Sequence, residues 1–168
     1  ARETPAPAVV LAHGFGGSKR SVADDARDLA DRGYVVLTYS ARGFGASTGQ
    51  IGLNDPRYEI ADLSELLDLL AERDEVRLDD DGDPRVGVAG GSYGGALALL
   101  GAAYDDRIDA IAPQITWSSL SAALFPSQAG EVAADTPAAA PQDGDAGVFK
   151  RLWAGLFFGV GAVPTGDL

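Results

Sequence analysis

Several residue types are missing or nearly missing from this chain of 168 residues. It contains no cysteine, which excludes disulfide frameworks, thiolate nucleophiles and cysteine-based zinc sites. It contains no methionine either, even at position 1, so we expect a processed form or a piece of a longer protein. Histidine occurs once, at His13, which limits any chemistry that needs an imidazole base.

Positive charge and long apolar runs are also scarce. Lys and Arg number 13 against 25 Asp and Glu, which gives a net charge of −12 at pH 7. An acidic surface argues against binding to nucleic acid or anionic membranes. No apolar run reaches the roughly 18 residues of a membrane span, and no signal-peptide pattern is visible at the start. The compartment stays open.

What remains is an ordinary globular composition, with 46% hydrophobic and 23% charged residues. Short apolar runs alternate with segments of helical periodicity, and a chain of this length can bury one core. Strands are predicted over residues 8–12, 34–39, 85–89 and 108–112, and helices over 22–31, 58–73 and 93–103. This alternation predicts an α/β domain with a parallel sheet and helices on both faces.

Polar and glycine-rich segments follow three of these strands. They are His13–Gly17, Ser40–Gly49 and the turn at Ser92. Ligands of parallel sheets bind beyond the carboxyl ends of the strands, so we expect these segments to meet at one edge.

The segment Gly90–Gly95 reads Gly-Gly-Ser-Tyr-Gly-Gly between a predicted strand and a predicted helix. Gly90, Ser92 and Gly94 occupy the fixed positions of a G-x-S-x-G nucleophile elbow. The turn is so sharp that side chains at its flanks would collide with backbone, and glycine removes the clash. On this argument we also expect a valine at Gly91 to disrupt the elbow.

Two acidic clusters in the sequence are better explained by exposure to solvent than by a binding role. The solvent-exposed face predicted for the helix over 58–73 carries Glu59, Asp62 and Glu65. The turn Asp79–Pro84 resembles a calcium loop in charge, but its glycine is misplaced and Gly90 stands where a bidentate Glu is needed. A solvated turn is favoured.

The character of the chain changes after Pro113, and we divide it into a core over 1–116 and a second segment over 117–168. Residues 127–147, rich in Ala, Pro, Gly and Asp, predict a mobile loop. Residues 148–163 are apolar and aromatic. They predict either a lid-like helix over the pocket or a helix whose apolar face needs another partner.

Together, His13–Gly17, Ala41–Gly49 and Gly90–Gly95 resemble the α/β-hydrolase fold, and the second segment resembles the R-G-x-G-x-S-x-G loop of many members. The combination is most similar to the X-Pro dipeptidyl-peptidase (S15) and CocE/NonD acyl-esterase branch, over roughly residues 8–113. Two positions depart from that pattern. Ser40 stands where many members have aspartate, and Phe15 lacks the tyrosine hydroxyl that some esterases add to the oxyanion hole.

The resemblance implies a serine hydrolase that acts on small acyl esters or peptides without metal or cofactor. Ser92 would be the nucleophile that forms an acyl-enzyme. The backbone N–H groups of Tyr93 and Phe15 would form the oxyanion hole.

The base and acid of such an enzyme are expected after the serine in the chain. No histidine follows Ser92, and His13 precedes the oxyanion loop, where the fold uses it structurally. No aspartate after the core is a convincing acid, whether Asp135, Asp143, Asp145 or Asp167. We therefore expect the N-terminal part of a hydrolase domain, and a poor catalyst as it stands.

Two other functions were weighed. A nucleotide-binding domain needs G-x-G-x-x-G or G-x-x-x-x-G-K-[ST], and Gly14–Arg20 fits neither. A non-catalytic binding protein on a hydrolase fold remains open, because the missing histidine would then be a true loss. The sequence does not separate esterase from peptidase or amidase, nor does it fix the oligomeric state.

Overall fold

The computed structural model describes residues 5–124 and 150–159. The chain divides into two compact units, Ala1–Thr116 and Trp117–Leu168, and each is described by itself. The loop predicted over 127–147 lies outside the described residues, as do the four aspartates from Asp135 onward.

The first unit alternates strands and helices as the apolar pattern predicted. Its elements are β1 (Ala8–Ala12), η1 (Lys19–Val22), α1 (Ala23–Asp31), β2 (Val35–Thr38), η2 (Pro56–Ile60), α2 (Ala61–Ala71), β3 (Leu78–Asp80), β4 (Asp83–Pro84), β5 (Val86–Gly91), α3 (Tyr93–Tyr104) and β6 (Ile108–Gln114). Helix α2 begins through a turn of π-helix, η2, which Asp55 caps and Pro56 opens.

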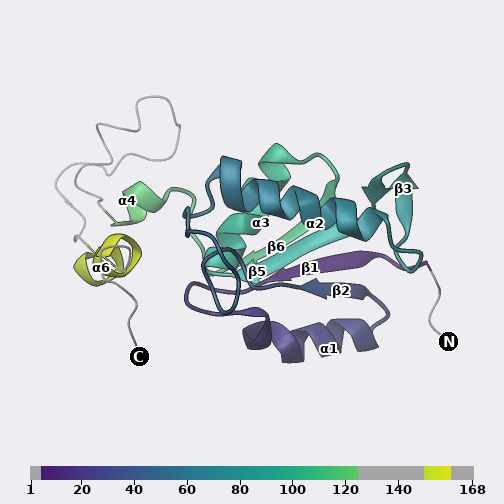
Figure 1. Cartoon of the computed structure of the whole chain (residues 1–168), viewed down its shortest axis with the longest axis horizontal. Helices are drawn as coiled ribbons and strands as arrows, with labels where there is room; N and C mark the ends of the chain where they lie inside the picture. The colour runs from purple at the N-terminus through teal and green to yellow at the C-terminus, as the bar shows by residue number, and fades with distance from the viewer. Residues whose placement is uncertain (1–4, 125–149, 160–168) are drawn as a thin grey trace. The chain divides into compact units, whose positions relative to one another are not determined.

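The main sheet has four parallel strands in the order β2-β1-β5-β6. Helix α1 covers one face, and α2 and α3 cover the other (Figure 1). The predicted parallel sheet with helices on both faces is confirmed. Because all four strands run in one direction, the loops that follow β1, β2 and β5 leave from the same edge.

The core lies between the sheet and the pair α2 and α3. Val10, Val86 and Val88 on the strands pack with Leu63 and Leu67 on α2, and none of these side chains is more than 1% exposed. At about 25 cal/mol per Å² of apolar surface removed from water, this layer is the main source of the unit's stability.

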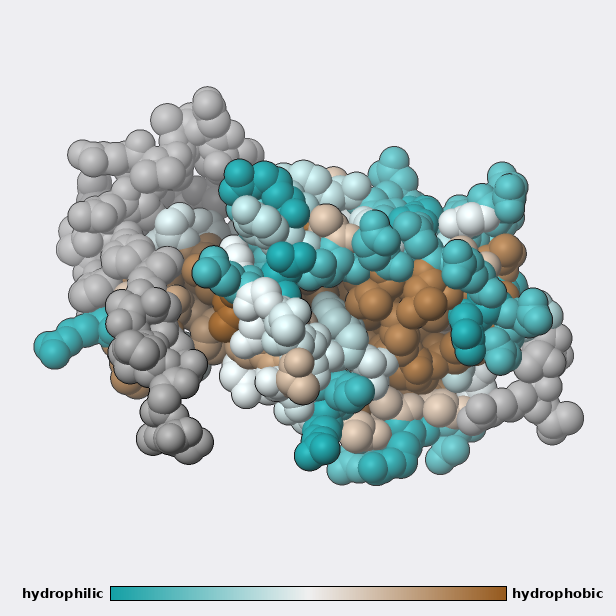
Figure 2. Space-filling view, in the orientation of Figure 1, coloured by the Kyte–Doolittle hydropathy of each residue, from teal (hydrophilic) through white to brown (hydrophobic). Residues whose placement is uncertain are grey.

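Both edges of the sheet are open within the described residues, since neither β2 nor β6 has a strand partner on its outer side. A hollow of about 700 Å³ runs along β2, with side chains of α1 and α2 on its walls. Figure 2 shows an apolar surface there, between the two helices. Its apolar lining includes Val35, Val36, Leu37, Leu69 and Leu70.

The acidic segment predicted as a solvated turn forms a short antiparallel hairpin, β3 with β4. Its strands are only three and two residues long, too short for an alternating pattern to be read. Among the described residues, no group of three or more His, Cys, Asp or Glu side chains could hold a metal ion.

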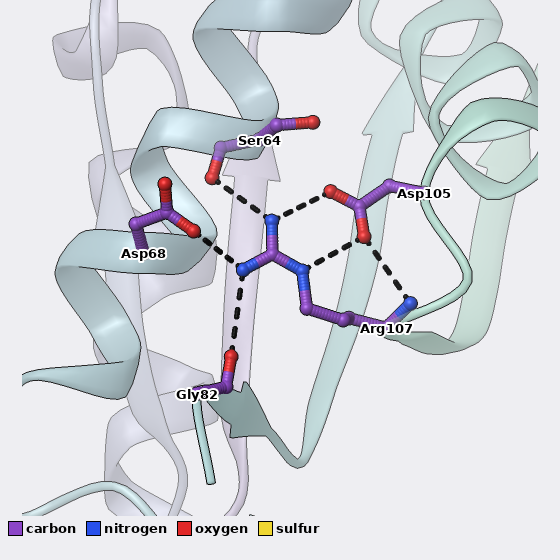
Figure 3. A network of polar contacts seen from close by, with 5 residues as sticks. All are labelled: Ser64, Asp68, Gly82, Asp105 and Arg107. Carbon is purple, nitrogen blue, oxygen red and sulfur yellow. Dashed lines mark hydrogen bonds and ion pairs between the residues drawn. The ribbon is translucent and has the colours of Figure 1, made fainter.

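At the amino end of β6, one arginine, Arg107, joins several segments of the chain (Figure 3). Its guanidinium donates to both oxygens of Asp105 at 2.9 and 2.8 Å. It also reaches Asp68 and the carbonyl of Ser64, both on α2, and the carbonyl of Gly82 in the β3–β4 turn. Three segments that are distant in sequence, α2, the β3–β4 turn and the turn between α3 and β6, are therefore joined at the end of the sheet opposite the elbow.

The second unit is described over α4 (Leu120–Leu124) and α6 (Arg151–Gly159). The ring of Phe157 contacts the rings of Trp117 and Trp153 at centroid distances of 6.0 and 5.9 Å. Ala154 is buried, whereas Leu152 is 82% exposed. None of the described helices is both long and apolar enough to span a membrane.

The Arg107 network predicts a pH dependence of stability. Hydrogen bonds from Arg107 lower the pKa of Asp105 from 3.8 to about 2. Because the folded state lowers this pKa, the contribution is complete above about pH 4 and is lost as the pH falls toward 2. The wild type should have a higher unfolding free energy than Asp105→Asn. This difference should be about 1 kcal/mol smaller at pH 3 than at pH 5. Urea titrations at both pH values measure this, and an unchanged difference would contradict the assigned ion pair.

Candidate active site

Ser92 lies between β5 and α3 in a conformation that few residues adopt. Its φ and ψ angles are 53° and −113°, and a positive φ is costly for any residue with a Cβ. The backbone on both sides holds it there. The Ser92 N–H donates to the Gln114 carbonyl at 2.8 Å, and its carbonyl accepts from the Ala96 N–H at 3.0 Å. A strained serine on a strand–turn–helix is the geometry of a nucleophile elbow.

Two glycines allow the turn to close. A Cβ on Gly90 would lie 2.7 Å from the carbonyl oxygen of Ala12, and one on Gly94 would lie 2.8 Å from the carbonyl carbon of the same residue. Both obstacles are backbone atoms, so the strand β1 would have to move.

The same argument fails at Gly91. A Cβ there would meet only the Gln114 carbonyl oxygen, at 4.0 Å. The expectation that Gly91 is sterically required was therefore wrong, because its side-chain direction is open.

The loop after β1 lies beside the serine. A Cβ on Gly14 would lie 3.9 Å from the Cβ of Ser92. The loop itself turns tightly, since the Gly17 N–H donates to the Gly14 carbonyl at 3.0 Å and Gly16 has a φ of 77°. Phe15, whose N–H is a candidate oxyanion donor, sits within this turn.

Three aromatic rings fasten the loops to one another. Phe15 follows β1, Phe44 follows β2, and Tyr93 begins α3. Their centroids are 5.2 Å apart for Phe15 and Phe44, 5.7 Å for Phe15 and Tyr93, and 5.6 Å for Phe44 and Tyr93, all edge-to-face. Such pairs contribute about 0.5–1.5 kcal/mol each beyond their burial. The three segments predicted to meet at the carboxyl edge do meet there.

His13 is a structural residue. Its ring is 2% exposed, and its Nε2 accepts from the Ala41 N–H at 3.0 Å. Because that nitrogen is an acceptor, the proton of the neutral ring lies on Nδ1, which donates to the Gly14 carbonyl at 2.8 Å. Both nitrogens are occupied in joining the first two loops, so His13 has none left to take a proton from Ser92.

The loop after β2 is anchored without the aspartate that the family resemblance led us to expect at position 40. The Ser40 hydroxyl accepts from the Lys19 N–H at 3.2 Å, and its carbonyl accepts from the Ser47 hydroxyl at 2.7 Å. Arg42 donates twice to Asp62 on α2, and these bonds raise the pKa of Arg42. The start of the loop is thus bound both to η1 and to α2.

Two buried residues next to the elbow were missed by the sequence reasoning. Asn54 and Glu59 are each 2% exposed, and both hydrogen-bond to Tyr93. Glu59 was assigned to the wet face of its helix, which is wrong. The signal was present, because Glu59 precedes Leu63 and Leu67 by four and eight residues and so shares their buried face.

The sequence matches the family model of the X-Pro dipeptidyl-peptidase (S15 family) over residues 1–148. It is similar to the quorum-quenching protein AidA of Acinetobacter baumannii (strain MDR-ZJ06), with 37% identity over 114 residues. That alignment covers 67% of this chain and 36% of the relative. The chain thus spans little more than a third of that protein.

Solved structures of α/β hydrolases share the fold. The α/β hydrolase GrgF from Penicillium sp. sh18 matches with a TM-score of 0.56 and 27% identity, over 66% of this chain and 37% of that one. Acetyl xylan esterase 1 from Thermoanaerobacterium sp. JW/SL YS485 matches with a TM-score of 0.60 and 23% identity, over 93% of this chain and 49% of that one. The described sheet is therefore a part of an α/β-hydrolase fold.

The elbow geometry predicts different outcomes for two neighbouring glycines. Gly94→Ala should lower the unfolding free energy by more than about 2 kcal/mol, because its Cβ meets the backbone of β1. Gly91→Ala is the matched control and should change it by less than about 1 kcal/mol. Urea or thermal unfolding of both variants tests this. Equal effects at the two positions would contradict the close approach of α3 to β1.

Proposed function

The chain belongs to the X-Pro dipeptidyl-peptidase (S15) family, and from that premise we propose that it acts as a serine hydrolase on ester or amide bonds. The observation that most supports this proposal is the positive φ of Ser92, with the loop of Gly14 directly beside it. Among the described residues no partner is hydrogen-bonded to the Ser92 hydroxyl, which leaves its oxygen available for attack.

The proposed reaction begins with the Ser92 oxygen adding to the substrate carbonyl carbon. The electron pair moves onto the carbonyl oxygen, where the N–H groups of Tyr93 and Phe15 would stabilise it. Helix α3 adds its N-terminal dipole at the same place. Collapse of this intermediate expels the alcohol or amine and leaves an acyl group on Ser92, which water then removes.

The serine proton needs a base, and we propose that a histidine outside these 168 residues supplies it. Two observations support this proposal. Both nitrogens of His13 are engaged in the loops, and the AidA relative is almost three times as long as the aligned segment. A carboxylate that orients this histidine would lie outside the chain as well.

We propose small acyl esters and short peptides as the substrate class. The family model is that of a peptidase, whereas the similar acetyl xylan esterase is an esterase by name. Helix α6 exposes large apolar side chains, Leu152, Trp153 and Leu156, and exposed apolar groups of this kind suit contact with an apolar partner such as an acyl chain.

A second function is favoured by one observation. The only histidine of the chain is committed to structure, so the elbow could present a serine that never reacts. The protein would then bind acyl or peptide ligands without hydrolysing them.

Ser92→Ala separates the two functions. In the natural full-length protein, a fluorophosphonate probe should label the wild type and leave Ser92→Ala unlabelled, because the probe needs the hydroxyl oxygen. Hydrolysis of p-nitrophenyl acetate should fall at least about a thousandfold in the variant. Ser127→Ala is the matched control for a serine outside the elbow. Full labelling or turnover in Ser92→Ala would refute the serine-hydrolase proposal.

A further inference from the structure

The segment between β2 and α2 holds Tyr93 at two points. The side-chain Nδ2 of Asn54 donates to the Tyr93 carbonyl at 3.0 Å, and the backbone N–H of Asn54 donates to the Tyr93 hydroxyl at 3.1 Å. That hydroxyl also lies 3.1 Å from Oε1 of Glu59. The first residue of α3 is thus fixed at its main chain and at the tip of its ring.

The direction of these bonds follows from the groups involved. The phenol oxygen accepts from the Asn54 N–H, and a carboxylate only accepts, so the Tyr93 proton points to Glu59. Burial and the nearby charge of Glu59 raise the pKa of Tyr93. The hydroxyl therefore stays protonated and remains a donor at neutral pH.

This arrangement is unfavourable as mere packing. Asn54 and Glu59 are buried, yet Oδ1 of Asn54 and Oε2 of Glu59 have no hydrogen-bond partner among the described residues. Leu53 and Asn54 also have left-handed φ angles, 58° and 63°. Unpaired buried oxygens and strained backbone both lower stability, and they persist where the surrounding structure imposes them at a functional site.

Tyr93 supplies one of the two proposed oxyanion donors through its backbone N–H. That N–H lies in the peptide plane between Ser92 and Tyr93. Because the nitrogen, the carbonyl carbon and Cβ of Tyr93 are all bonded to its Cα, holding the carbonyl and the ring fixes where the nitrogen lies beside Ser92. We propose that Asn54 and Glu59 are positioning residues that aim the Tyr93 N–H at the oxyanion. This inference rests on the proposed serine-hydrolase function and adds two residues to it.

The test compares Tyr93→Phe and Asn54→Asp with the wild type in the natural full-length protein. Neither change alters the Tyr93 N–H itself. Each should lower kcat for p-nitrophenyl acetate about tenfold. Each should also weaken the binding of phenylboronic acid, which forms a tetrahedral adduct with a reactive serine, by a similar factor. KM should stay within about twofold, because the ground-state carbonyl needs the donor less. A merely structural role would not move kcat and boronate affinity together at constant KM.

Four further variants make the outcome unambiguous. Glu59→Gln keeps an acceptor for the Tyr93 hydroxyl and should retain most of the kcat that Glu59→Ala loses. Asn54→Gly relieves the strain of the left-handed φ but removes the side-chain Nδ2 donor. Its kcat should therefore fall even if the variant folds more stably. Arg107→Lys, at the other end of the sheet, should lower the melting temperature without changing kcat.

The inference is overturned if Tyr93→Phe and Asn54→Asp bind phenylboronic acid as the wild type does, or if Arg107→Lys loses the same kcat as they do. Failure of the underlying function looks different, because Ser92→Ala would then hydrolyse the ester as fast as the wild type. In that case the positioning role falls with it.

Discussion

The site depends on the close approach of the first turn of α3 to the last residue of β1. A side chain on Gly94 would overlap the backbone of Ala12, and one on Gly90 would overlap both Ala12 and Gly94. Because helix and strand approach this closely, the chain between β5 and α3 has no room for a longer loop. The turn closes in one residue, and that residue, Ser92, takes a left-handed backbone conformation.

The remaining features at the carboxyl edge serve to keep this turn in place. His13 joins the first two loops through both ring nitrogens, and the rings of Phe15 and Phe44 pack against Tyr93. At the amino edge, Arg107 joins α2, the β3–β4 turn and the turn between α3 and β6. The Arg107 network and the proposed site therefore lie at opposite ends of one sheet, as expected where ligands bind at the carboxyl ends of parallel strands.

The sheet and the position of the elbow could be predicted because apolar runs and glycine spacing are local signals. The four strands of the main sheet appear where the runs of Val, Leu, Ile and Ala predicted them. The burial of Glu59 was missed, because a carboxylate was taken as a marker of solvent although its spacing from Leu63 places it inside. The open side of Gly91 was missed as well, since steric need depends on neighbours such as Gln114 that are distant in sequence.

The most direct measurement is a crystal structure of the natural full-length protein after reaction with a fluorophosphonate. The account predicts a bond from phosphorus to Oγ of Ser92, with the phosphoryl oxygen about 2.7–3.1 Å from the backbone nitrogens of Phe15 and Tyr93. A phosphonyl group on another residue, or a phosphoryl oxygen turned away from both nitrogens, would contradict it.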